Sequence, residues 1–249
     1  MSLIYGVNPV TEAIVSGKTI NKIYAQKGNK EVYQVIQKAK EKRIVVVEAE
    51  KNKLDRMITD ENEKLKNSQG IVASVTDYNY YTIDDILEEA SMRNEPPFII
   101  ILDKIEDPQN LGAIVRSVEC LGAHGVIIQK RNASQVTDTV EKVAAGACNY
   151  VKIARVTNIT ESIKYLKKQG LWIYGLDMEG ATDVYSTDLS GPIGIVVGNE
   201  GSGISNLVLK NCDGVIKIPM TGNIESLNAS VSAAICMYEI VRQKNLKNK

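Results

Sequence analysis

Short, fully apolar runs alternate with helical patterns from residue 98 onward, and this rhythm limits the folds open to the chain. Each run is long enough for one strand, and the lack of polar alternation indicates that both faces of the strand are buried. Strands of this kind belong to parallel sheets that helices cover on both faces. We therefore predict an α/β domain built on a parallel sheet. Its strands are expected at 98–102, 125–129, 151–154, 171–175, 193–197 and 215–218, and its helices at 114–121, 137–145, 159–168 and 227–244.

The first 76 residues form a separate pattern of shorter elements. Strands are expected at 22–25, 44–47 and 70–75, and helices at 10–15, 31–42 and 51–64. An acidic stretch that ends in Pro96-Pro97 then interrupts the pattern, although 83–91 keeps helical character. We accordingly divide the chain into a small α/β domain at 1–76, a linker at 77–97 and the parallel-sheet domain at 98–249.

Composition permits two domains and says little about function. The chain has 249 residues, 44% of them hydrophobic, and a formal net charge of zero, so it can bury a sizeable core. Residues 1–76 hold 13 Lys and Arg against 9 Asp and Glu, which fits nucleic-acid binding and also an ordinary solvated domain. No apolar stretch approaches the roughly 20 residues that span a bilayer, and the start lacks signal-peptide features, which predicts a cytoplasmic protein without a membrane partner.

The sequence gives no indication of a metal site or of disulfides. The four cysteines form no C-x-x-C pair and have no His-rich partner sequence, which predicts reduced thiols. His124 is the only histidine and lies between a helix and a strand, so we interpret it as a turn or edge residue and not as a general base. Trp172, in LWIYG, is expected in the core.

A polar segment follows the first strand of the parallel-sheet domain. It reads DPQNLGAIVRS, at 107–117, and contains Asn110 and Arg116. If its helix begins near Leu111, Arg116 lies on the second turn and projects toward the strand ends, where open α/β folds bind ligands. Both residues also have an ordinary structural interpretation, Asn110 as a helix cap and Arg116 as a surface cation.

Two further segments begin at strand ends, IGIVVGNEGSGIS at 193–205 and IKIPMTGNIESLNASVSAA at 216–234. The first has the spacing G-x-x-G-x-G, which matches neither the dinucleotide fingerprint nor a P-loop and disfavours nicotinamide and nucleoside triphosphate ligands. Such a loop can also be a simple turn. In the second, Ser226 or Asn228 can cap the last helix.

In this order, the three segments resemble the three motifs of the SpoU (TrmH) family of RNA 2′-O-methyltransferases, in the SPOUT superfamily. The resemblance covers 103–241, and YGVNPVTEAI at 5–14 is similar to the family's small N-terminal RNA-binding domain. It implies a C-terminal methyltransferase domain that contains a trefoil knot, an exception to the usual rules of chain topology. One departure is Ser68, where relatives carry the histidine of His-Gln-Gly, so no role of that histidine transfers here.

The resemblance also implies a cofactor and a set of site residues. The cofactor is S-adenosylmethionine (S-adenosyl-L-methionine), and the residues implied around it are Val197, Gly198, Gly203, Ile218, Met220, Leu227 and Asn228. The residues implied in catalysis are Asn110, Arg116, Glu200 and Ser226. Because a guanidinium keeps its proton at neutral pH, we assign Arg116 to orientation and electrostatic stabilisation. An RNA phosphate oxygen, Glu200 and Ser226 are the alternatives for proton removal.

The expected partners are RNA and a second copy of the chain. The family pairs through its C-terminal domain, and here the final helix has an apolar pattern too broad for one buried stripe, formed by Val231, Ala234, Ile235, Tyr238 and Val241. The separate N-terminal domain resembles the branch that methylates a guanosine of large-subunit (23S) ribosomal RNA, the RlmB type. The alternatives are a tRNA 2′-O-methyltransferase and a non-catalytic RNA-binding or ribosome-assembly protein. A non-catalytic protein would lack the polar motif residues that are present here.

Overall fold

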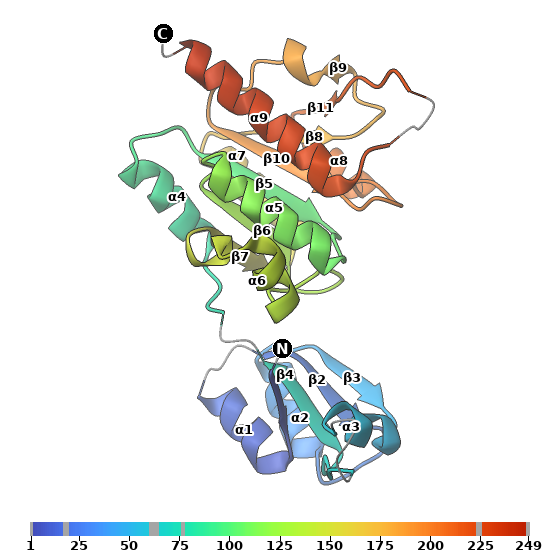
Figure 1. Cartoon of the computed structure of the whole chain (residues 1–249). Coiled ribbons are helices and arrows are strands. Elements are labelled where there is room, and N and C mark those ends of the chain that lie inside the picture. Colours follow the sequence, from blue (N-terminus) through green and yellow to red (C-terminus); the bar gives the residue numbers. More distant parts are fainter. Residues whose placement is uncertain (1, 17–19, 60–64, 76–77, 223–225, 248–249) are drawn as a thin grey trace. The chain divides into compact units, whose positions relative to one another are not determined.

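The chain divides into two compact units, residues 1–79 and 80–249, in the computed structural model (Figure 1). The structure describes residues 2–16, 20–59, 65–75, 78–222 and 226–247. Each unit has its own sheet and its own clusters of buried apolar side chains.

The first unit is a four-stranded sheet in the order β1-β4-β2-β3. Its strands are β1 (Ser2–Tyr5), β2 (Ile20–Gln26), β3 (Val46–Ala49) and β4 (Ile71–Val75), and its helices are α1 (Val7–Val15), α2 (Tyr33–Glu41) and α3 (Lys51–Met57). Alternation along β4 sends Ile71 and Ala73 into a cluster with α1 and α2, and Val72 into a smaller cluster with α3. The helix predicted at 51–64 ends at Met57, and 60–64 lie outside the described residues.

Ser68 is an internal residue of this unit. It is fully buried, and its backbone N–H and hydroxyl both donate to Asp55 Oδ1, at 2.8 and 2.5 Å. The following residues, Gln69 and Gly70, have left-handed φ angles of 54° and 75°, and Gln69 Oε1 accepts from the Val7 N–H at 3.1 Å. The segment that departs from the family pattern therefore anchors a turn, and Ser68 presents no group to solvent.

The second unit is built on a seven-stranded sheet in the order β7-β6-β5-β10-β8-β11-β9. Every neighbouring pair in it is parallel, which confirms the predicted parallel sheet. Its strands are β5 (Phe98–Asp103), β6 (Gly125–Gln129), β7 (Lys152–Val156), β8 (Trp172–Leu176), β9 (Thr182–Asp183), β10 (Ile193–Gly198) and β11 (Gly214–Lys217). Its helices are α4 (Ile83–Met92), α5 (Pro108–Cys120), α6 (Asp138–Ala144), α7 (Ile159–Lys168), α8 (Asn206–Leu209) and α9 (Ala229–Lys247).

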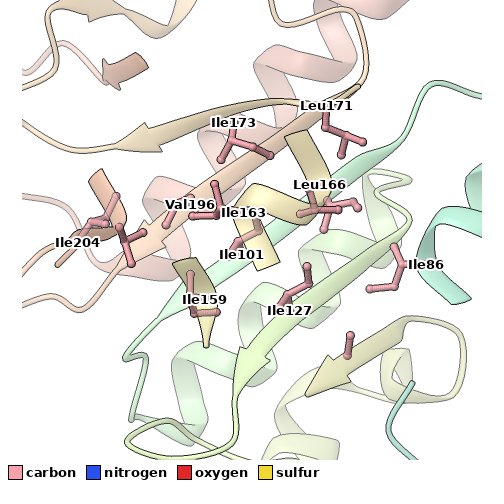
Figure 2. Close-up of a cluster of buried hydrophobic side chains, with 13 residues drawn as sticks. Ile86, Ile101, Ile127, Ile159, Ile163, Leu166, Leu171, Ile173, Val196 and Ile204 are labelled. Atoms are coloured by element: carbon pink, nitrogen blue, oxygen red, sulfur yellow. The ribbon is translucent and has the colours of Figure 1, made fainter. Parts of the chain in front are cut away.

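Helices cover both faces of this sheet. On one face, Ile99 and Ile101 of β5 join Ile163 of α7 in a cluster of buried side chains (Figure 2). Ile100 and Leu102 alternate with them and point to the opposite face, where α5 packs against α6 and α9 (Figure 1). β5 is buried along its whole length, as a central parallel strand must be when both faces are covered.

Helix α4 lies within the expected linker and packs on the second unit. Its Ile86 is fully buried in the cluster of Figure 2, and Tyr81, just before the helix, forms a parallel bridge with Ala154 of β7. Residues 80–97 therefore belong to the body of the second unit in this structure.

The prediction that Trp172 lies in the core is wrong. The residue is 59% exposed. It begins β8, where the next residue, Ile173, takes the buried position in the cluster with α7, and strand alternation turns Trp172 to the other face.

The direction of the chain connections reverses between β5 and β10. The chain leaves β5 through α5 toward β6, and it leaves β10 through α8 toward β11 on the other side. The register pairs Gly198, at the end of β10, with Asp103, at the end of β5. Loops that diverge at such a point leave a crevice outside the carboxyl ends of the strands, where open α/β folds bind ligands.

Candidate active site

A hollow of about 460 Å³ lies at these carboxyl ends. The loops that follow β8, β10 and β11 enclose it together with the start of α9, all within the second unit. Most of the predicted cofactor and catalytic residues line it, namely Val197, Gly198, Glu200, Gly203, Ile218, Met220, Ser226 and Leu227. The structure thus brings the second and third polar segments together around one space.

The loop after β10 requires its glycines because its backbone folds closely on itself. A Cβ atom on Gly198 would lie 2.3 Å from the carbonyl carbon of Gly203, closer than any side chain can approach. Gly203 has a φ of 63°, in the left-handed region that favours glycine. The backbones of Asn199 and Gly203 form two hydrogen bonds with each other, at 3.2 and 2.8 Å. Residues 199–203 therefore form a tight hairpin, which is one wall of the hollow.

Two contacts tie this hairpin and the segment that follows it to the end of β5. Asp103 is fully buried, and its Oδ2 accepts from the backbone N–H and the hydroxyl of Ser205, at 2.8 and 2.6 Å. Asn199 donates from Nδ2 to the Lys104 carbonyl at 3.1 Å. Asp103 and Asn199 were not identified as site residues from the sequence. The feature that could have identified them is that each is a polar residue at the end of a buried strand.

Asn110, Glu200 and Asn228 form one hydrogen-bonded group, although Asn110 and Asn228 are 118 residues apart. Asn110 donates from Nδ2 to Glu200 Oε1 at 2.9 Å. Asn228 donates from Nδ2 to Asn110 Oδ1 at 2.9 Å and to the same Glu200 oxygen. Asn110 is only 5% exposed, whereas Glu200 and Asn228 are exposed. Each of the three polar segments therefore contributes one side chain to this group.

The structure also tests the capping interpretations. Asp107 caps α5, since its Oδ1 accepts from the Gln109 N–H at 2.9 Å, and Asn110 is thereby available to Glu200. Asn228 precedes α9, and its Oδ1 accepts from the Ser230 N–H at 2.9 Å. Asn228 therefore caps its helix with one side-chain atom and joins the site with the other.

Arg116 lies apart from the hollow. It is exposed on α5 and is absent from the lining residues, and its guanidinium makes no hydrogen bond or ion pair within the described part of the chain. The position of Arg116 on the second turn assumed a helix that begins near Leu111, whereas α5 begins at Pro108 and Arg116 lies on its third turn. At about 1.5 Å per residue, Arg116 is roughly 12 Å along the helix from its start.

The loop after β8 supplies lining residues that the sequence did not predict. Asp177, Met178 and Glu179 line the hollow, and Asp177 Oδ1 accepts from the Glu179 N–H at 3.1 Å. The feature that could have identified them in the sequence is their position after a strand that ends at the same sheet edge as the strands before the other two loops. With Glu200, their carboxylates make the hollow acidic and favourable for a cationic group.

His124 takes no part in this site, because it lies at the amino end of β6. It is buried, its Nδ1 accepts from the Phe98 N–H at 2.9 Å, and its Nε2 lies 3.1 Å from Glu95 Oε2. Burial and the nearby Arg93 lower the pKa of His124. The ring is therefore neutral at pH 7, with its proton on Nε2.

No group of three or more His, Cys, Asp or Glu side chains in the described ranges could hold a metal ion. No helix in the part of the chain that the structure describes is both long and apolar enough to cross a membrane.

Known protein families match most of the chain. The SpoU rRNA methylase family matches residues 97–238, and the RNA 2′-O ribose methyltransferase substrate-binding family matches residues 3–81. YacO of Bacillus subtilis, whose name assigns it to the TrmH family of tRNA/rRNA methyltransferases, is 39% identical over 244 residues, covering 97% of this chain and 96% of YacO.

Two solved structures extend the comparison. The SpoU methyltransferase AviRb from Streptomyces viridochromogenes, in complex with the cofactor AdoMet, has a TM-score of 0.62 and 25% identity and covers 98% of this chain and 90% of AviRb. The TrmH/SpoU tRNA modifying enzyme of A. aeolicus has a TM-score of 0.57 and 28% identity and covers 62% of this chain and 78% of its own. The family matches account for both units, and the fold joins the three polar segments through the hydrogen bonds among Asn110, Glu200 and Asn228. The chain belongs to the SpoU family of RNA methyltransferases.

Proposed function

We propose that this protein transfers the methyl group of S-adenosylmethionine to a ribose 2′-hydroxyl of RNA. The observation that carries this proposal is the meeting of Asn110, Glu200 and Asn228 beside a small-molecule hollow. Family membership supports the methyl transfer to RNA, and AviRb supports the cofactor, since it was crystallised with AdoMet.

The hollow suits S-adenosylmethionine in size and chemistry. Its volume of about 460 Å³ is typical of small-molecule sites. Val197, Ile218 and Leu227 offer apolar surface to an adenosine, and Asp177 and Glu179 offer negative charge to its cationic groups. When bound, the cofactor supplies a methyl group on a positively charged sulfur. The residues that we place around it are Val197, Gly198, Gly203, Ile218, Met220, Leu227 and Asn228.

The task of the chain itself is alignment. Holding two reactants in the correct geometry can lower the activation barrier by about 7–11 kcal/mol. The hydrogen bonds that join Asn110, Glu200 and Asn228 fix the Glu200 carboxylate. Its Oε2 has no hydrogen-bond partner among the described residues and can accept from a ribose hydroxyl.

Proton removal from the ribose hydroxyl has three candidate acceptors. Glu200 and Ser226 both line it and are candidate acceptors, and an RNA phosphate oxygen is the third. Arg116 keeps its charge at neutral pH, so its proposed role is to hold an RNA phosphate and stabilise charge in the transition state.

We also propose a homodimer that pairs through α9. This helix packs against α5 and leaves Val231, Ile235 and Tyr238 exposed by 44, 38 and 64%, and such apolar surface marks an interface. Light scattering at micromolar concentration should give twice the chain mass of 27.3 kDa. Tyr238→Glu should shift the protein toward monomer, whereas Met92→Glu, at an exposed position at the end of α4, should not. A monomeric unaltered protein would contradict the proposal.

The proposed target is a guanosine of 23S ribosomal RNA, as in the RlmB type. The N-terminal unit matches a substrate-binding family. Its Lys27 and Lys30 follow β2 and are exposed. The Lys22 Nζ lies 5.8 Å from the centroid of the Tyr24 ring. Lys18 lies outside the described residues. Such lysines bind phosphates with salt-dependent affinity and little base readout, so the shape of a folded loop would distinguish the target.

Deleting residues 1–76 is expected to leave cofactor binding intact and to abolish methylation of large-subunit RNA. The reason is that the lining of the hollow lies wholly in the second unit, whereas the proposed RNA lysines lie in the first. Calorimetry with S-adenosylmethionine and a methyl-transfer assay measure the two activities. Full methylation by the truncated chain would remove the N-terminal unit from substrate binding.

Transfer of a labelled methyl group tests the proposed function and its alternatives. The full-length protein is incubated with a 23S transcript and, separately, with bulk tRNA. Methylation of the 23S transcript alone supports the proposed target, and methylation of tRNA alone moves the target to tRNA. RNA binding without any cofactor binding would favour a non-catalytic RNA-binding or ribosome-assembly protein.

A further inference from the structure

The end of β7 holds a guanidinium that makes no ion pair with any described carboxylate. It belongs to Arg155, whose Cζ lies 4.3 Å from the ring centroid of Tyr80. Its Nη1 lies 3.5 Å from Gln135 Oε1, in the loop 130–136 that follows β6. Stacking on an aromatic ring and a single amide contact orient a guanidinium without neutralising it.

Both partners of Arg155 are themselves held in place. Gln135 donates from Nε2 to three backbone carbonyls within 129–134, at 2.9 to 3.3 Å. Tyr80 Oη accepts from the Val136 N–H at 2.8 Å. The guanidinium is therefore set in one orientation by the fold, and little conformational freedom is left to lose when a ligand binds.

The positive charge of Arg155 is partly desolvated. Burial lowers the pKa of its guanidinium, which still keeps its proton at neutral pH. Burial also raises the pKa of Tyr80 to about 12, so the phenol stays neutral and does not balance the charge. Since Tyr80 and Gln135 engage only part of the planar fork, donors remain for an external anion.

The place of Arg155 in the sheet indicates which anion this is. β7 is three strands from β10, and a spacing of about 4.8 Å per strand puts their carboxyl ends roughly 14 Å apart. Ser134 donates from its N–H to the Ile105 carbonyl at 2.7 Å, which joins the loop 130–136 to the segment leading to Asn110. Exposed Arg131 adds a second cation to this loop.

We propose that Arg155, together with Arg131, binds a phosphate of the RNA strand whose target ribose lies at the hollow. The planar fork of arginine matches two phosphate oxygens at once. This contact rests on the proposed RNA methyltransferase function. It gives the second unit its own RNA contact, on the same edge of the sheet as the Asn110–Glu200–Asn228 group.

RNA binding measured at several salt concentrations tests the contact. The probe is a fluorescent 23S transcript, titrated with full-length protein between about 50 and 200 mM salt. Arg155→Gln should weaken binding about tenfold and reduce the slope of log K against log salt by about one. Arg155→Lys should keep the slope and lose affinity, because lysine lacks the planar fork. Arg93→Gln, which removes a cation paired with Glu89 at 2.8 Å, is the matched control and should bind normally.

Melting temperature and cofactor affinity separate this contact from a merely structural role. If Arg155 only braces Tyr80 and Gln135, Arg155→Gln lowers the Tm while the salt slope stays unchanged, and the proposal is overturned. Arg131→Gln, on an exposed side chain, provides a second test that does not depend on folding, and it should also reduce the slope. If the unaltered protein binds no RNA, the contact and the proposed function both fail. If it binds and methylates RNA and both arginine variants match it, the contact alone fails.

Discussion

Gly198→Val is expected to weaken the binding of S-adenosylmethionine by at least about 100-fold, or roughly 2.7 kcal/mol. A Cβ atom at this position would lie 2.3 Å from the carbonyl carbon of Gly203, so the hairpin 199–203 would have to open. That movement displaces one wall of the hollow and the Glu200 carboxylate with it. Isothermal titration calorimetry measures the loss directly.

Gly191→Val is the matched control for this substitution. Gly191 lies just before the opposite end of β10, and a Cβ atom there would meet no atom within 4 Å. We expect this variant to bind the cofactor normally, and both variants to keep the circular dichroism spectrum of the unaltered protein. Unchanged affinity in Gly198→Val would mean that the cofactor binds elsewhere.

Arg116→Ala should lower methylation by roughly 100-fold or more, with cofactor affinity changed by only a few fold. The expected loss is that of a charge which orients the RNA and acts mainly in the transition state. The residue is absent from the lining of the hollow, which is why cofactor binding should be nearly unaffected. Single-turnover kinetics at saturating RNA measure the effect, and near-normal turnover would remove Arg116 from the mechanism.

The position of Arg116 on the outer surface of α5 adds a second measurement. In a proposed dimer paired through α9, the neighbour of α5, the guanidinium can serve its own hollow or that of the partner. Mixing Arg116→Ala subunits with Glu200→Gln subunits distinguishes the two. Recovered activity in the mixture means that Arg116 acts on the partner's hollow, and no recovery means that it acts on its own.

Apolar periodicity predicted the elements of the second unit well, because their patterns are long and regular. β6 and α7 have the predicted bounds, 125–129 and 159–168. Periodicity does not report which strands are neighbours, so the insertion of β10 between β5 and β8, which creates the crevice, came only from the structure. The trefoil knot stays a prediction, which rests on the family resemblance.

The motifs predicted residue types at the site and could not give their contacts. Asn110, Glu200 and Asn228 were each identified, but their shared hydrogen bonds cross long stretches of sequence that only the fold brings together. Asp103 was missed because a single carboxylate at the end of a strand has no distinctive spacing. Arg116 was expected on the second turn of its helix and lies on the third, because Pro108, a favourable first residue of a helix, starts α5 before Leu111.

The most direct test of the central claim is the position of the methyl group on the RNA product. Ribosomal RNA incubated with the protein and S-adenosylmethionine is digested to nucleosides and analysed by mass spectrometry. We predict one new species, a guanosine with the added methyl on the ribose, and an alkali-resistant linkage at that nucleotide, since a methylated 2′-oxygen cannot attack the neighbouring phosphate. A methyl group on a base would contradict ribose 2′-O-methylation by this site, and so would the absence of any methylation of both ribosomal RNA and tRNA despite bound cofactor.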